Sequence, residues 1–186
     1  MIALETSVLD GLGEVEARAD TFTGVQVDSR RIASGDLFVA VGRGSEFVDD
    51  AFAHGAAATL LPLDAFAALA RIAQAVRERS SARVVGITGS MGKTSTKDIL
   101  AALSAPSART IAAEASYNNE IGVPLTLCRL EADTEVCVLE LAMRGFGQIA
   151  ELAAIARPQI GVVTNVGPVH LELVHSLDGE IGRAHV

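Results

Sequence analysis

VVGITGSMGKTS, residues 84–95, places an apolar run before a glycine-bearing loop, a lysine and hydroxyl side chains. Two glycines allow the backbone to turn tightly, so that successive N–H groups converge on an anion at the start of a helix. The lysine adds a positive charge for the β- and γ-phosphates of a nucleotide, and a hydroxyl is offered to Mg²⁺. We therefore predict a phosphate-binding loop for ATP formed by Gly89, Ser90, Met91, Gly92, Lys93, Thr94 and Ser95.

The loop departs from the strict pattern G-x-x-x-x-G-K-[ST], because Ile87 stands where the first glycine is expected. The first glycine is instead Gly86 or Gly89. A glycine turn that only caps a helix is the alternative. We favour nucleotide binding, because Gly-Lys-Thr directly after an apolar strand is rarely a chance combination.

The residues after position 80 alternate between strands and helices. Strands are predicted at residues 84–88, 110–113, 136–141 and 160–165, and helices at 93–104, 119–130 and 148–156. Such β-α-β wiring predicts an α/β fold with a parallel sheet covered by helices on both faces, in which ligands bind at the carboxyl ends of the strands. We expect residues 81–186 to form a partial, P-loop-type ATP-binding domain.

Residues 1–80 are predicted to form a separate, small α/β domain. Strands at 25–27 and 37–41 flank a polar segment with a turn signal, and a helix follows over 49–58. Apolar residues with helical spacing predict a second helix over 64–79, which we expect to bridge to the second domain.

Composition and charge exclude several classes of protein. The chain is 49% hydrophobic with a formal net charge of -8, so we expect a folded protein that does not bind nucleic acid. Cys128 and Cys137 lie in apolar stretches and are expected to be buried, inert thiols of a reducing compartment. The amino terminus lacks a basic leader, and no apolar run reaches about 18 residues, so we expect a cytoplasmic monomer without membrane insertion.

Three ordered segments resemble the Mur ligase family, the amide-bond-forming enzymes of peptidoglycan precursor synthesis. They are TGSMGKTS (88–95), SYNNEIGVP (116–124) and TNVGPVHLE (164–172). The amino-terminal stretches VDSRR (27–31) and GDLFVA (35–40) resemble the uridine-nucleotide-binding domain of the family members that extend the peptide stem. The resemblance runs from about residue 25 to 183. It implies that residues 1–80 bind a UDP-sugar-peptide, with Ser29 and Arg30 contacting the uracil or the diphosphate.

Within the family, the NNEIGVP and HLE variants look most like the members that join UDP-N-acetylmuramoyl-tripeptide to D-alanyl-D-alanine. The resemblance implies that the γ-phosphate of ATP is transferred to a carboxylate and that an amine then attacks the acyl phosphate. In that reaction two Mg²⁺ ions and Lys93 would offset the repulsion between the triphosphate and the incoming carboxylate, so we expect positioning and electrostatics to carry most of the catalysis.

The resemblance also implies a metal site and catalytic residues. Glu140 matches the family's metal-binding glutamate, and His170 matches its magnesium-ligating histidine, although Mg²⁺ prefers oxygen. Together with the loop hydroxyl, the expected metal ligands are Thr94, Glu140 and His170, and the expected catalytic residues are Lys93, Asn119 and His170.

Asn118 and Asn119 precede a predicted helix, where asparagine is a common cap. One of the two is expected to cap this helix while the other faces the ligand. The sequence leaves open which residue has which role.

Members of the family are considerably longer than this chain, and where they continue into a lysine this sequence has His185. We therefore expect the chain alone to ligate nothing measurable and to expose apolar edges where later strands would pair. Three alternatives stay open. They are a relative that adds diaminopimelate or lysine, a relative of folylpolyglutamate synthase, which the DSR segment disfavours, and a non-catalytic nucleotide-binding module that acts through a partner chain.

Overall fold

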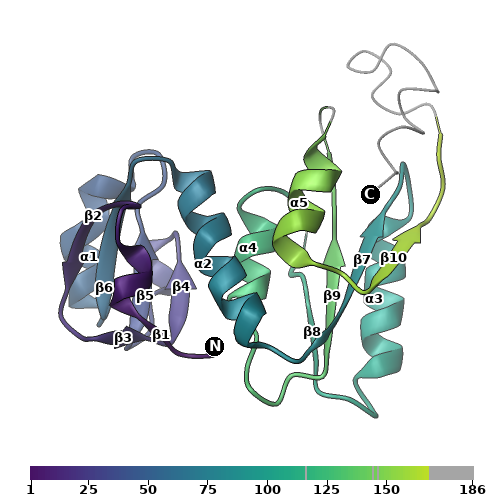
Figure 1. Ribbon diagram of the computed structural model, residues 1–186, viewed down its shortest axis with the longest axis horizontal. Helices are drawn as coiled ribbons and strands as arrows, with labels where there is room; N and C mark the ends of the chain where they lie inside the picture. The colour runs from purple at the N-terminus through teal and green to yellow at the C-terminus, as the bar shows by residue number, and fades with distance from the viewer. Residues whose placement is uncertain (116, 144, 146, 168–186) are drawn as a thin grey trace. The chain divides into compact units, whose positions relative to one another are not determined.

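The computed structural model describes residues 1–115, 117–143, 145 and 147–167 (Figure 1). The chain divides into two compact units. The first contains residues 1–80 together with 127–132, and the second contains residues 81–126 and those from 133 onward.

The first unit is built on a four-stranded sheet with the order β2-β6-β5-β4. Its strands are β2 (Gly13–Ala17), β4 (Gly24–Gln26), β5 (Asp36–Val39) and β6 (Ala58–Pro62). Strand β2 runs antiparallel to β6, and the other pairs are parallel. Every residue of β5 is buried, as expected for a parallel strand covered on both faces. A short antiparallel pair, β1 (Leu4–Glu5) and β3 (Thr21–Phe22), adds to the unit.

Short helices fill the connections of the first unit. They are the 3₁₀ turns η1 (Thr6–Leu9), η2 (Ser29–Arg31) and η3 (Gly44–Phe47), followed by α1 (Val48–Ala53) and α2 (Ala65–Arg79). Asp64 begins α2, because its carboxylate accepts the N–H groups of Phe66 (2.9 Å) and Ala67 (3.0 Å). The apolar face of α2 is buried, which confirms the predicted helix.

The predicted helix over residues 49–58 is wrong in its second half. Helix α1 ends at Ala53, Gly55 turns the chain at φ +100°, and Ala58 already belongs to β6. An alanine-rich stretch has high helix propensity, but here pairing with β5 and β2 decides its conformation. The strands β2 and β6 were not predicted.

The second unit contains a parallel four-stranded sheet with the order β10-β7-β9-β8, which confirms the predicted fold class. The strands are β7 (Arg83–Thr88), β8 (Thr110–Ala112), β9 (Val136–Glu140) and β10 (Ile160–Val163), and the helices are α3 (Lys93–Ser104), α4 (Gly122–Leu127) and α5 (Gln148–Ala156). Val85, Ile87 and Val138 form a buried core on the sheet. Helix α4 is shorter than the predicted 119–130, and β10 ends before the predicted Asn165.

The direction of the crossovers explains where ligands can bind in this unit. From β7 the chain crosses to β8 in one direction, and it returns to β9 and then β10 in the other. Because parallel crossovers are right-handed, α3 and α5 must cover opposite faces of the sheet, and Figure 1 shows them there. The connections after the neighbouring strands β7 and β9 therefore leave toward opposite faces. This leaves a crevice at their carboxyl ends, where α/β proteins bind ligands.

Candidate functional site

The loop after β7 has the backbone of an anion-binding turn. Gly89 has φ +131° and Gly92 has φ +82°, both in the region that favours glycine. A Cβ atom on Gly89 would meet the Thr164 hydroxyl and would lie 2.9 Å from the carbonyl oxygen of Asn165. Glycine is therefore required at position 89 by close approach as well as by conformation.

Residues that follow β10 support this loop from the side. The N–H groups of Ser90 (3.0 Å) and Met91 (2.8 Å) donate to the main-chain and side-chain oxygens of Asn165, respectively. The hydroxyl of Thr164 donates to Met91 O at 2.6 Å, and the N–H of Gly167 donates to Ser90 Oγ at 2.8 Å. Of the predicted phosphate ligands, Ser90 and Met91 thus have main-chain N–H groups that already donate within the protein.

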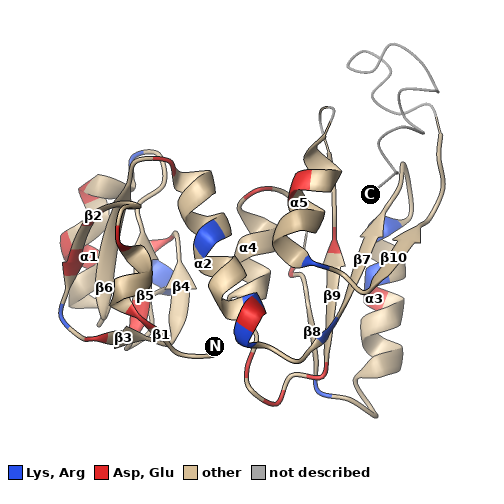
Figure 2. Ribbon diagram, in the orientation of Figure 1, with Lys and Arg blue, Asp and Glu red and all other residues tan. Residues whose placement is uncertain are grey.

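The start of α3 places the remaining predicted ligands together. Gly92 is the residue before the helix, and the first helical hydrogen bond joins Thr96 N–H to Gly92 O. The N–H groups of Lys93, Thr94 and Ser95 therefore belong to the first turn, where N–H groups have no partner within the helix. The basic residues of α3 gather at this same end of the helix (Figure 2). Phosphate is favoured at such a terminus by the N–H groups and by the helix dipole.

Two side chains of α3 reach back from this first turn. The ammonium of Lys93 donates to Gly89 O at 2.6 Å and so lies along the loop. The hydroxyl of Thr94 donates to Glu140 Oε2 at 2.8 Å. The loop at the end of β7 and the last residue of β9 are thereby joined, at the crevice that the topology predicts.

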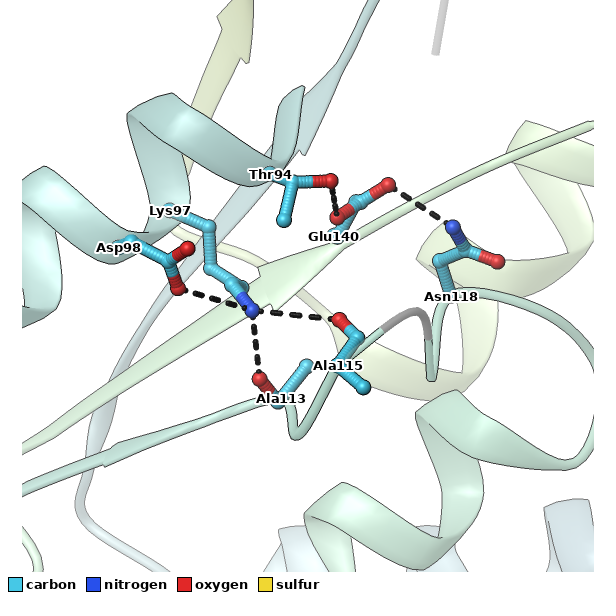
Figure 3. A network of polar contacts seen from close by, with 7 residues as sticks. All are labelled: Thr94, Lys97, Asp98, Ala113, Ala115, Asn118 and Glu140. Carbon is cyan, nitrogen blue, oxygen red and sulfur yellow. Dashed lines mark hydrogen bonds and ion pairs between the residues drawn. The ribbon is translucent and has the colours of Figure 1, made fainter. Parts of the chain in front are cut away.

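Glu140 is buried, with 2% of its surface exposed, and both of its carboxylate oxygens accept hydrogen bonds from neutral groups (Figure 3). Oε2 accepts from Thr94, and Oε1 accepts from Asn118 Nδ2 at 2.8 Å. Among the described residues no Lys or Arg pairs with this carboxylate. A buried carboxylate without a cationic partner beside a hydroxyl is a set of hard oxygen donors, and this set fits Mg²⁺.

The two asparagines have different roles. Asn119 Oδ1 accepts the N–H groups of Ile121 (3.2 Å) and Gly122 (2.9 Å) and so caps α4. Asn118 reaches Glu140 instead. Of the two, Asn118 is therefore the one that contacts Glu140, whereas the side-chain oxygen of Asn119, the residue predicted to be catalytic, is used by the helix.

A second candidate site lies in the first unit. A pocket of about 790 Å³ is lined by residues that include Ser29, Arg30, Phe47 and Arg43. Ser29 is buried, and Arg30 donates two hydrogen bonds to Asp28 at 2.8 and 2.7 Å. These bonds lower the pKa of Asp28 to about 2. The pocket brings together both residues predicted to contact the uridine nucleotide.

One predicted site residue lies outside the described part of the chain, and some contacts of the site were not predicted. His170 lies outside the described residues. The support of the loop by Thr164 and Asn165 was not predicted, although both residues belong to the quoted segment TNVGPVHLE. The burial of Lys97 in α3 was not predicted either, because a lysine on an amphipathic helix is usually solvated.

Within the described part of the chain, no group of three or more His, Cys, Asp or Glu side chains gathers as a metal centre. Magnesium sites beside nucleotides commonly use only one or two carboxylates together with phosphate and water, so Glu140 and Thr94 still fit such a site. None of the described helices is long and apolar enough to cross a membrane.

Comparison with known proteins adds independent findings. The family model described as Mur ligase middle domain matches residues 87–184. The UDP-N-acetylmuramoyl-tripeptide--D-alanyl-D-alanine ligase of Synechocystis sp. is 40% identical over 168 residues, which cover 80% of this chain and 37% of the relative. The ligase of the same name from Escherichia coli is 36% identical in an alignment that covers 96% of this chain and 44% of the relative. The chain thus spans about two fifths of the length of these relatives.

Solved structures show the same similarity. A crystal structure of MurF from Acinetobacter baumannii matches with a TM-score of 0.85 and 26% identity, over 99% of this chain and 46% of that one. MurF ligase from Thermotoga maritima in complex with ADP matches with a TM-score of 0.75 and 32% identity, over 87% of this chain and 42% of that one.

Proposed function

Because this chain belongs to the Mur ligase family, we propose that it carries the uridine-nucleotide-binding and ATP-binding parts of a ligase. The reaction joins D-alanyl-D-alanine to UDP-N-acetylmuramoyl-tripeptide in peptidoglycan precursor synthesis. The names of the relatives in Synechocystis sp. and Escherichia coli support this choice of substrates.

The hydrogen bond between Thr94 and Glu140 is the observation that carries the proposal. It joins the phosphate-binding loop to the buried carboxylate of Glu140 at the carboxyl end of β9, the end of the sheet where α/β proteins bind ligands. In this proposal the first-turn N–H groups of α3 hold the β- and γ-phosphates, and Lys93 turns its ammonium from Gly89 O toward them. The neighbour solved with ADP is consistent with a nucleotide at this loop.

Thr94 and Glu140 would hold Mg²⁺, with the predicted ligand His170 as a third group. The ion supplies charge neutralisation between the triphosphate and the carboxylate that is to be phosphorylated. The protein's own contribution is to fix the phosphates on rigid N–H groups and to orient the carboxyl group of Glu140 by two neutral donors. Asn118 takes the position in this proposal that the sequence suggested for Asn119.

The pocket of the first unit is proposed to bind the uridine diphosphate end of the other substrate. Ser29 offers a hydroxyl there, and the guanidinium of Arg30 is oriented by Asp28. The proposal includes a monomer located in the cytoplasm, where ATP is available, and sedimentation of the purified chain would test the monomer.

Calorimetric titration of the chain with UDP-N-acetylmuramoyl-tripeptide tests the substrate assignment. Ser29→Ala removes one hydrogen-bonding group, so we expect roughly 3- to 10-fold weaker binding of the uridine substrate. The affinity for magnesium-ATP should not change, because Ser29 lies in the first unit. Failure of the unaltered chain to bind the uridine substrate at millimolar concentration would contradict the assignment.

A further inference from the structure

Lys97 is a buried lysine that the reaction proposed above does not use. It lies on α3, one turn after Lys93, and only 2% of its surface is exposed. Its ammonium donates to Ala113 O at 2.8 Å and to Ala115 O at 3.3 Å, and it pairs with Asp98 Oδ1 at 3.0 Å (Figure 3). A buried ammonium is costly unless its donors are paired, and here three acceptors surround it.

The two carbonyl groups that accept from Lys97 belong to the chain just after β8. Ala115 has φ +43°, a left-handed conformation that is unfavourable for a residue with a Cβ atom. Such a residue persists where its surroundings hold it in place. The ammonium of Lys97 contacts the carbonyl of Ala115 itself and that of Ala113, so it is placed to hold this backbone.

The same connection carries Asn118 to Glu140. Asn118 Nδ2 donates to Glu140 Oε1 at 2.8 Å, and Asn118 O accepts the N–H of Ala142 at 2.9 Å. The connection between β8 and α4 is therefore held by Lys97 near its start and by the end of β9 at Asn118. Figure 3 shows both sets of contacts, those of Lys97 with Ala113 and Ala115 and that of Asn118 with Glu140.

We propose that Lys97 is a positioning residue of the magnesium-ATP site. Its ammonium fixes the backbone after β8 so that Asn118 donates to Glu140 and leaves the other carboxylate oxygen facing Thr94. Groups that orient a metal ligand from behind commonly change metal affinity 10- to 100-fold when they are altered. The inference rests on the proposed function, because the orientation of Glu140 has a consequence only if magnesium-nucleotide binds there.

The contact can be tested in the nucleotide-free protein. The asparagines of this sequence are Asn118, Asn119 and Asn165, so ¹⁵N-asparagine labelling gives a simple NMR spectrum of side-chain amides. In Lys97→Gln the amide signals of Asn118 should move, while those of Asn165 stay in place. Lys97→Arg keeps the charge and the donors, so it should bring the Asn118 signals back toward their wild-type positions. Arg71→Gln removes one charge from an exposed position of α2 and serves as the matched control.

A second measurement compares ATP affinity with magnesium and with EDTA. In Lys97→Gln the gain in affinity due to magnesium should shrink about 10-fold, while ATP binding in EDTA stays near wild type. Unmoved Asn118 signals, an unchanged magnesium gain, or a Lys97→Gln chain that does not fold would each overturn the positioning role. A wild-type chain that ignores magnesium-ATP would refute the proposed function. The amide comparison would still decide whether Lys97 sets the Asn118 contact.

Discussion

Replacing Gly89 by alanine tests the geometry of the phosphate-binding loop. Position 89 has φ +131°, and a Cβ atom there would meet the hydroxyl of Thr164 and lie 2.9 Å from Asn165 O. The Thr164 hydroxyl cannot turn away without cost, because it donates its hydrogen to Met91 O at 2.6 Å, with Thr88 O as a second acceptor at 3.2 Å. Alanine must therefore distort the loop, the segment after β10, or both.

The size of the effect follows from these contacts. A residue with a Cβ atom in this backbone region costs about 1–3 kcal/mol. Loss of the hydrogen bond from the Thr164 hydroxyl adds about 0.5–1.5 kcal/mol. A loss of about 3 kcal/mol lowers the melting temperature of the second unit by roughly 12–24 °C. If the loop relaxes instead, its first-turn N–H groups move and the affinity for magnesium-ATP falls.

Thermal unfolding of Gly89→Ala measures the loss of stability, and calorimetric titration with magnesium-ATP measures the loss of affinity. Gly161→Ala is the matched control, because Gly161 lies in β10 and a Cβ atom there would have no neighbour within 4 Å among the described residues. We expect the control to keep the wild-type melting temperature and affinity. A Gly89→Ala chain with wild-type stability and wild-type affinity would refute the account of this loop.

Three further changes probe other parts of the molecule. Glu140→Gln removes the buried charge proposed to hold Mg²⁺, so the affinity gained from magnesium should fall at least about 10-fold, and an unchanged gain would contradict the metal site. Arg30→Ala should raise the pKa of Asp28 from about 2 toward 3.8, as measured by NMR titration of the carboxyl carbon. Because folding lowers this pKa, the ion pair stabilises the chain above about pH 3.8 and its contribution is lost as the pH falls toward 2, so a wild-type midpoint near 3.8 would argue against the pair. Burial raises the pKa of Cys128 to about 12, so alkylating reagents should modify it near neutral pH only after denaturation, and rapid modification of the folded chain would count against its burial.

Some elements of the fold were predictable because local chemistry marks both their start and their type. Helices α3 and α5 have the predicted bounds, and each follows a glycine with positive φ, Gly92 and Gly147. Strand β7 was recognised by its apolar run. Strand β2 was not predicted because its sequence, GEVEA, has more exposed charge than apolar surface. Strand β6 was not predicted because alanine favours helix, a preference that pairing with the neighbouring strands overrides.

The sequence predicted those residues of the candidate site whose side-chain type alone indicates their chemical role. Glu140 at the end of an apolar strand and the hydroxyl after Lys93 were both expected, and the structure joins them. The choice between Asn118 and Asn119 needed the direction of each side chain, which depends on where α4 begins. Lys97 needed the path of the chain after β8, because its acceptors lie 16 and 18 residues away.

The central claim is that the first turn of α3 and Lys93 bind the phosphates of ATP. Calorimetric titration of Lys93→Ala with magnesium-ATP tests this claim most directly. Removing a charged donor to phosphate costs about 1.5–3 kcal/mol, which corresponds to roughly 10- to 100-fold weaker binding. The affinity for the uridine substrate should stay at the wild-type value. An unchanged affinity of Lys93→Ala for magnesium-ATP would contradict the claim, as would a wild-type chain that fails to bind the nucleotide at millimolar concentration.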